Sequence, residues 1–194
     1  MGKTRLEAFS DGVLAIIITI MVLELKVPHS PTFEALAELL PVFLSYVLSF
    51  IFVGIYWANH HHLLHTVNKV NGAIIWANNH LLFWLSLIPF TTGWMGENHF
   101  EPLPVAAYGV VMFCAGVAYT ILTVVIIRSQ GSGSALAKAV GKDWKGKLVL
   151  PLILFGILAA FVIHPWVAGA CYVAVAAIWF IPDRRIEKSL TSEV

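Results

Sequence analysis

The sequence predicts an all-α membrane protein with six transmembrane helices, formed as a single domain over residues 1–194. Its composition carries this prediction. Hydrophobic residues make up 59% of the chain and charged residues only 12%, whereas a soluble domain carries about 25% charged residues. The mean hydropathy of +0.82 agrees with burial in lipid. These values exclude a soluble enzyme, and the net charge of +1 provides no basic face for nucleic acid.

Uncharged runs locate the first four spans. The first, residues 6–25, is uncharged from position 12 to position 23 and has acidic residues only near its ends. The next three runs are long enough for a helix to cross the hydrocarbon core, which takes about 20 residues. We therefore predict further spans at residues 36–62, 71–96 and 102–128.

The last apolar run, residues 148–182, contains no Asp, Glu, Lys or Arg and is too long for one untilted helix. His164, Pro165 and Trp166 stand at its middle. A proline breaks a helix, and tryptophan favours the membrane interface. We therefore predict two short spans, residues 147–163 and 166–182, joined by a tight hairpin.

The distribution of basic residues supports six spans with both chain ends in the cytoplasm. With the N-terminus inside, all of the 12 lysine and arginine residues except Lys26 fall in inner segments. An excess of lysine and arginine is typical of cytoplasmic loops. A single span in place of the hairpin would put Arg184, Arg185 and Lys188 outside, so the charges independently favour the hairpin.

Polar residues gather at the start of the first span, where Arg5, Phe9, Ser10 and Asp11 precede the apolar run. Glu7 and Asp11 are four residues apart and repel each other unless a cation or a donor from another helix lies nearby. Ionisable groups at membrane depth are candidate functional residues, but a helix end can also bring them to the interface. The spacing alone leaves both interpretations open.

Beyond Asp11 the first span is apolar on every face, so the sequence does not mark which side meets lipid. Such a helix is enclosed by other helices or encloses something itself. Ile16, Ile20 and Leu23 fall on one helical stripe, and Thr19 lies beside it. A stripe of this kind is usually a packing surface. The functional alternative is a hydrophobic constriction formed by several copies of the helix around one axis.

A second polar cluster ends the second span and comprises Trp57, His60, His61, His62 and His65. His61 and His65 have a spacing that can share a metal, but two imidazoles without a third ligand are a weak zinc signal. We interpret the histidines as side chains at the membrane interface, facing water. The sequence predicts no metal site, no cofactor and no enzyme, because it contains no nucleophile–base pair and no glycine-rich phosphate loop.

The third predicted span carries amide, imidazole and hydroxyl groups at Asn78, Asn79, His80 and Ser86. Polar side chains inside a membrane usually form hydrogen bonds between helices. We therefore expect these residues to join the third span to its neighbours.

The order of Arg5, Phe9, Ser10 and Asp11 at the head of the first span resembles the signature of the TMEM175 family of potassium channels. The six-span count also fits that family, so the resemblance covers most of the chain. The other segments that fit are residues 12–19, 57–65 and 87–90. One six-span unit is present where vertebrate members have two, so the chain resembles the prokaryotic members, which assemble as homotetramers.

The resemblance implies a potassium-selective cation channel whose pore is lined by the first helix of each subunit. It implies no carbonyl filter of the familiar potassium-channel kind, and the sequence contains no Thr-Val-Gly-Tyr-Gly loop. It places the first hydrophobic constriction at Ile16, with further layers at Ile20 and Leu23 and a candidate hydroxyl layer at Thr19.

The resemblance gives the motif residues Arg5, Phe9, Ser10 and Asp11 a structural role, which is to hold the inner half of the first helix by hydrogen bonds. An ideal helical wheel turns Asp11 well away from Ile16, in agreement with that role. Arg5 falls near the stripe and could equally flank the inner mouth of the pore.

A ring of isoleucine offers no oxygen to replace hydration water, so potassium, the more weakly hydrated ion, passes more easily than sodium. We therefore expect modest selectivity, rising from sodium to potassium to caesium, and closure by dewetting. A secondary ion transporter is the alternative, although the chain lacks an internal repeat and a mid-span ionisable residue in its last three spans. A membrane metalloenzyme using the histidines is the third. The single-unit length indicates a prokaryotic plasma membrane.

Overall fold

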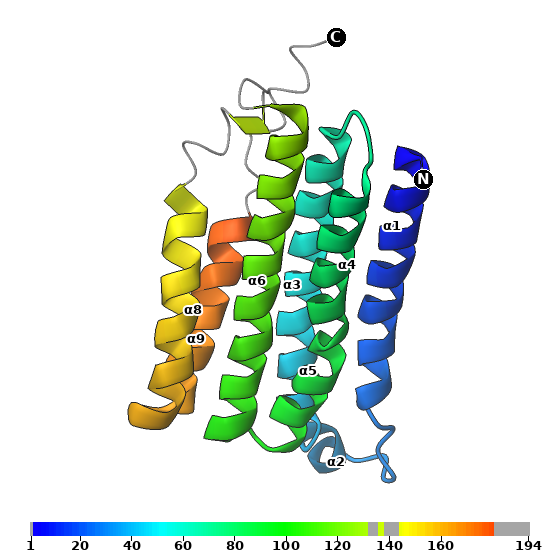
Figure 1. Ribbon diagram of the computed structural model, residues 1–194. Helices are drawn as coiled ribbons and strands as arrows, with labels where there is room; N and C mark the ends of the chain where they lie inside the picture. Colours follow the sequence, from blue (N-terminus) through cyan, green and yellow to red (C-terminus); the bar gives the residue numbers. More distant parts are fainter. Residues whose placement is uncertain (1, 132–135, 138–143, 181–194) are drawn as a thin grey trace.

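The computed structural model describes residues 2–131, 136–137 and 144–180, and these residues form helices joined by turns, without a β-strand. Figure 1 shows the long helices side by side, with neighbours along the chain running in opposite directions. In chain order the helices are α1 (Lys3–Ile20), the 3₁₀ helix η1 (Met21–Glu24), α2 (Phe33–Ala37), α3 (Leu40–His65), α4 (Gly72–Ser86), α5 (Ile88–Glu97), α6 (Pro102–Gln130), α8 (Trp144–Val162) and α9 (Pro165–Phe180). The predicted all-α class is confirmed.

Four helical segments are long and apolar enough to cross a membrane, namely α1 with η1, α3, α4 with α5, and α6. α8 and α9 are also apolar but shorter. The predicted hairpin between them is present, since α8 ends at Val162 and α9 begins at Pro165. The backbone N–H of His164 donates to the carbonyl of Ala159 at 2.9 Å, which closes the last turn of α8.

The predicted third span matches the segment Gly72–Glu97, which consists of two consecutive helices with a break that was not predicted. α4 ends at Ser86, Leu87 lies in a turn, and α5 begins at Ile88. Pro89 is in the first turn of α5 and has no N–H to donate to the preceding turn, so the helical hydrogen bonding is interrupted here. The second span also starts later than predicted, because Phe33–Ala37 form the separate helix α2 and α3 begins only at Leu40.

The helices are arranged so that α1 lies at one edge of the bundle and the α8–α9 hairpin at the opposite edge, with α3, α4 and α6 between them (Figure 1). α1 packs against α3 and α4, while α8 and α9 pack against each other and against α6. An edge position leaves one side of α1 without neighbours in the subunit.

Close packing in the opposite half of the bundle depends on a glycine. A Cβ atom at Gly109 of α6 would stand only 2.1 Å from Oη of Tyr172 on α9, so a larger residue would displace that ring. Tyr172 is fully buried, and its hydroxyl donates to the carbonyl of Val105 at 3.2 Å. The two helices can therefore approach closely enough to fix the hairpin against α6.

Candidate functional site

The buried face of α1 is formed by residues about one helical turn apart. Leu6, Leu14, Ile17 and Met21 are at most 4% exposed and belong to the core that α1 shares with α3 and α4. The sequence could not identify this face, because the other faces of α1 are equally apolar. The packing of α1 against α3 and α4 determines which face is buried.

The predicted stripe lies on the exposed side of α1. Ile16 is 61% exposed, Ile20 46% and Leu23 72%, and Thr19 is exposed with them. The Thr19 hydroxyl donates to the carbonyls of Ala15 at 2.9 Å and Ile16 at 3.1 Å, so its hydrogen is directed to its own helix. Large apolar side chains on an edge helix need cover from lipid, from another subunit or from a narrow pore.

Small residues share this exposed side. Ala8, Gly12 and Ala15 are all exposed, and a Cβ atom built at Gly12 would meet no atom within 4 Å. Small side chains allow the backbones of membrane helices to approach closely. The exposed side of α1 therefore combines bulky residues at one end with a flat surface near the motif.

A buried chain of hydrogen bonds anchors α1 to two other helices. The Asn78 side-chain amide of α4 donates to Oγ of Ser10 at 3.0 Å, and Ser10 itself donates to the carbonyl of Leu6 at 2.9 Å. The Asn78 side-chain oxygen accepts from Nε2 of His60 on α3 at 2.6 Å. Ser10 and Asn78 have no exposed surface, and His60 is 1% exposed. The expected hydrogen bonding between helices is confirmed for Asn78, whereas the hydrogen bonds of His80 and Ser86 lie within α4.

The burial of His60 corrects the interpretation of the histidine cluster as a group facing water. His60 points into the bundle because its partner Asn78 lies on the neighbouring helix. His61 and His65 are exposed, as expected, with ring centroids 4.9 Å apart, and His62 is half-buried. Within the described part of the chain, no group of three or more His, Cys, Asp or Glu residues is placed to hold a metal ion.

Asp11 lies at the edge of the exposed side and has the donor on another helix that the sequence analysis expected. The indole N–H of Trp57 on α3 donates to Oδ1 of Asp11 at 3.1 Å. Both residues are exposed, so the contact is a surface hydrogen bond.

Arg5 and Phe9, the other two motif residues, point away from the bundle. Phe9 is 54% exposed and Arg5 is exposed. Arg5 makes no hydrogen bond or ion pair with another residue in the described ranges. The motif thus divides into a buried anchor at Ser10, a surface contact at Asp11, and two side chains available to partners outside the subunit.

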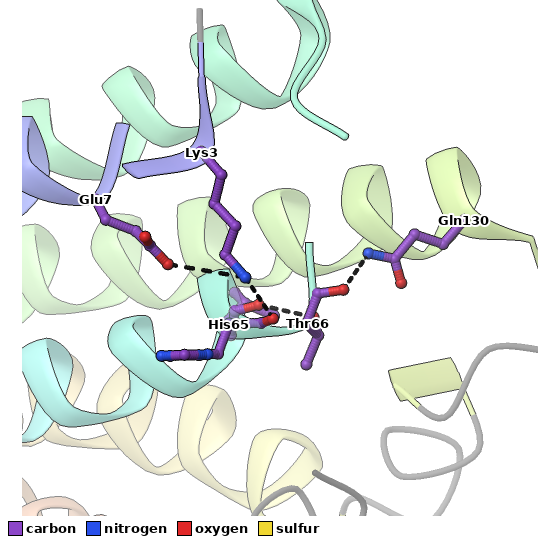
Figure 2. Close-up of polar contacts among 6 residues, drawn as sticks. Lys3, Glu7, His65, Thr66 and Gln130 are labelled. Carbon is purple, nitrogen blue, oxygen red and sulfur yellow. Dashed lines mark hydrogen bonds and ion pairs between the residues drawn. The ribbon is translucent and has the colours of Figure 1, made fainter. Parts of the chain in front are cut away.

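The first turn of α1 is held by the C-terminal end of α3, where the last carbonyls of a helix lack partners inside that helix (Figure 2). Nζ of Lys3 donates to the carbonyl of His65 at 2.7 Å and lies 4.0 Å from Oε1 of Glu7. The Gln130 side chain of α6 donates to the next carbonyl, that of Thr66, at 2.5 Å. The positive charge of Lys3 also interacts favourably with the negative, C-terminal end of the α3 dipole. This contact could not be predicted from the sequence, because capping by a distant helix has no local sequence signal.

The other end of α1 is fixed by a second ion pair. Nζ of Lys26, just after η1, lies 2.5 Å from Oε1 of Glu97 at the end of α5. This hydrogen bond and the charge of Glu97 raise the pKa of Lys26, so the ammonium form is favoured further. The Glu24 side chain packs on Gly93, where an added Cβ would stand 3.0 Å from its carboxyl group. The exposed stripe is therefore carried on a helix that is tied down at both ends.

Known proteins match this chain over the region just described. A family model described as the endosomal/lysosomal potassium channel TMEM175 matches residues 5–89. A protein of Chryseobacterium sp. (strain P1-3) that is named a potassium channel is 56% identical over 190 residues, which are 98% of each chain. A Gallus gallus protein named endosomal/lysosomal proton channel TMEM175 is 29% identical over 160 residues, covering 74% of this chain and 32% of its own length.

The fold also matches a solved structure. The crystal structure of a lysosomal potassium-selective channel TMEM175 homolog from Chamaesiphon minutus is similar with a TM-score of 0.80 and 25% sequence identity. The match covers 93% of this chain and 97% of that chain. The similarity therefore extends over nearly the whole chain.

Proposed function

This chain belongs to the TMEM175 family, a family of ion channels, and we propose that it is a passive, potassium-selective cation channel with one pore lined by α1 of four subunits. The observation that carries the proposal is the exposed stripe of Ile16, Ile20 and Leu23 on an edge helix. A single subunit cannot enclose a pore with one helix, but several copies around an axis can.

The proposed topology has six spans, with α8 and α9 as the fifth and sixth. Two short apolar helices joined at His164 and Pro165 return the chain to the side from which α8 starts. This arrangement keeps the basic residues on the side of the N-terminus, in the cytoplasm. We place the channel in a prokaryotic plasma membrane, since one six-span unit matches the length of the bacterial relative.

The proposed mechanism uses the apolar ring itself. Isoleucine side chains supply no oxygen ligands, so an ion passes with part of its hydration shell removed or compressed. Potassium holds its water less strongly than sodium and loses less at such a ring. The selectivity is therefore modest, and a small inward movement of α1 closes the ring by expelling water. Thr19 is the one hydroxyl next to the stripe and can offer its oxygen to a hydrated ion.

Reconstitution of the purified protein into liposomes tests the function. We expect potassium flux that grows with the electrochemical gradient and continues without a co-ion, whereas a secondary transporter needs the co-ion and an enzyme gives no flux. Proton flux is measured in the same vesicles, because a vertebrate relative is named a proton channel and the bacterial one a potassium channel. Flux that stops when the co-ion is removed would refute a passive channel.

The mass of the purified protein in detergent tests the assembly. We expect four chains of 21.4 kDa per particle, because the proposed pore needs the exposed side of α1 from four subunits around one axis. Ala8, Gly12 and Ala15 provide a flat surface for the neighbouring α1. A stable monomer or dimer with full conductance would contradict the proposed tetramer.

The Asp11 contact is expected to act through assembly and not through ion selection. Asp11→Ala removes the acceptor of the Trp57 indole and should destabilise the tetramer by about 1 kcal/mol, since the contact is exposed. Asp11→Asn keeps an oxygen acceptor and should lose less. The measurement is the fraction of tetramer that survives mild heating, compared with Trp57→Phe. A normally assembled Asp11→Ala channel with an altered potassium-to-sodium ratio would instead place Asp11 in the pore.

The exposed histidines are expected to be dispensable for conduction. His61 and His65 lie near each other but lack a third ligand among the described residues. Replacement of both by asparagine should leave potassium flux within about twofold of the parent. Surface substitutions usually change stability by less than about 0.5 kcal/mol, which corresponds to a factor of about two in an equilibrium constant. Loss of flux, or its recovery on addition of zinc, would show that these histidines form a functional metal site.

A further inference from the structure

A cavity of about 600 Å³ is lined by residues of α3, α6, α8 and α9 and by Leu136. Of these helices, α8 and α9 lie at the edge of the bundle opposite to α1 (Figure 1). The volume of the cavity falls within the range of about 300 to 1,000 Å³ that is usual for ligand pockets. No residue of α1 lines it, so it is separate from the exposed stripe. Most of its wall is apolar, with side chains such as Phe52, Leu63, Ile153 and Val175.

The local sequence shapes the contact between α6 and α8 beside the cavity. Gly116 of α6 presents bare backbone, and a Cβ atom there would stand 2.9 Å from Cδ2 of Leu150 on α8. Pro151 lies inside α8 and has no N–H to donate to the carbonyl of Lys147 one turn earlier. α8 therefore meets α6 closely at one glycine and begins beside the cavity with one helical hydrogen bond missing.

Three polar side chains in the wall donate hydrogen bonds to carbonyls of their own helices. Asn59 donates from Nδ2 to the carbonyl of Ile55 at 2.8 Å. Thr120 and Thr123 each donate to the carbonyl four residues earlier, both at 2.9 Å. These groups make little demand for water, and an apolar cavity that stays dry binds apolar molecules. The interior therefore suits a hydrocarbon chain.

The rim of the cavity combines access from outside with the positive charge of Lys147. Thr120 and Val124 of α6 and Lys147 and Pro151 of α8 line the cavity and are also exposed, so it opens between these two helices. Within the described ranges, no carboxylate lies within ion-pair distance of Lys147. α8 begins at the end of the bundle where α1 begins (Figure 1). The rim thus presents the ammonium group of Lys147 at the end of the bundle where α8 begins.

We propose that this cavity binds one anionic phospholipid per subunit, with an acyl chain inside and its phosphate at Lys147. A hydrocarbon chain matches the apolar wall, and the negative headgroup complements the positive charge of Lys147 at the rim. Basic pockets between membrane helices bind anionic headgroups in this way, and each lysine near a membrane surface contributes about 1 kcal/mol. This site is independent of the pore, so its test does not rest on ion conduction.

Native mass spectrometry of the purified protein in detergent tests the proposal. The protein is titrated with dioleoylphosphatidylglycerol or dioleoylphosphatidylcholine, and the bound lipids are counted. We expect one tightly held phosphatidylglycerol per subunit. Lys147→Gln should lower the preference for phosphatidylglycerol about fivefold, as follows from about 1 kcal/mol per lysine. Thr120→Phe should fill the opening and remove the tightly held lipid of either type.

Matched variants separate this site from a general attraction to the protein surface. Lys69→Gln makes the same charge change at an exposed position outside the cavity and should keep the preference. Ile121→Phe adds an aromatic ring to the exposed surface of α6 beside the cavity and should keep the lipid. If Thr120→Phe does not assemble, Val124→Phe fills the same rim. The proposal would be overturned if Lys147→Gln and Lys69→Gln lost the preference for phosphatidylglycerol equally. Full retention of the tightly held lipid in a variant whose cavity is filled would also overturn it.

Discussion

Replacement of Asn78 by leucine is expected to destabilise the assembled protein by about 1 to 2 kcal/mol, the largest loss of stability that we predict for a single polar residue. Asn78 is fully buried and joins three helices, since it donates to Ser10 of α1 and accepts from His60 of α3. Leucine has a similar volume but leaves the His60 N–H without an acceptor in a medium that contains no water. Such an unsatisfied buried donor costs more than the hydrogen bond contributes in water.

The measurement is the midpoint temperature for loss of the tetramer, followed by size-exclusion chromatography after heating. Asn79→Leu is the matched control, because Asn79 is the next residue, is only half-buried and takes no part in the chain of hydrogen bonds. The double variant Asn78→Leu with His60→Leu should recover part of the loss, since replacing both partners removes the unsatisfied donor. Equal effects of Asn78→Leu and Asn79→Leu would contradict the anchoring role.

The general architecture could be predicted from the sequence because the bilayer imposes simple length and charge rules. Apolar runs of about 20 residues predicted the long helices, and a proline in the middle of an overlong run predicted the α8–α9 hairpin. The break between α4 and α5 was missed, although Pro89 was visible in the sequence. The apolar run continues across it, so hydropathy carries no signal for the interruption.

The candidate site was only partly predictable, for a physical reason that is clearest in α1. Ile16 and Ile17 are chemically identical, yet Ile16 is 61% exposed and Ile17 is 4% exposed. Periodicity grouped Ile16, Ile20 and Leu23 on one stripe, but only the packing of α1 on α3 and α4 shows that this stripe faces outward. Likewise His60 and His61 are neighbours, and the position of Asn78 on α4 decides which of them is buried.

Substitution of Ile16 by asparagine is expected to lower the potassium-to-sodium permeability ratio while conductance holds or rises. Ile16 is the residue that both the stripe and the family resemblance assign to the constriction, and its side chain is 61% exposed in the subunit. An amide at the ring admits water and offers sodium an oxygen in place of the hydration water it loses. Sodium gains more than potassium from this replacement, because its hydration is stronger.

A polar contact contributes about 0.5 to 1.5 kcal/mol. If sodium gains this amount relative to potassium, the potassium-to-sodium permeability ratio falls roughly two- to tenfold. The ratio is measured from reversal potentials under potassium on one side of the membrane and sodium on the other. Leu23→Asn should act in the same direction but more weakly if the outer layer is wider. Val22→Asn is the matched control, since Val22 is 45% exposed but lies outside the stripe, and it should leave the ratio unchanged.

The decisive comparison uses channels whose tetramer is intact by mass, so that a folding defect cannot imitate a change in selectivity. If an intact Ile16→Asn channel keeps the permeability ratio of the parent, Ile16 is not at the narrowest ring, because a polar group there must alter the dehydration barrier. If Val22→Asn lowers the ratio as much as Ile16→Asn does, the pore follows a different face of α1 from the proposed one. A fall confined to Ile16→Asn, with a smaller one for Leu23→Asn, is the result that the exposed stripe predicts.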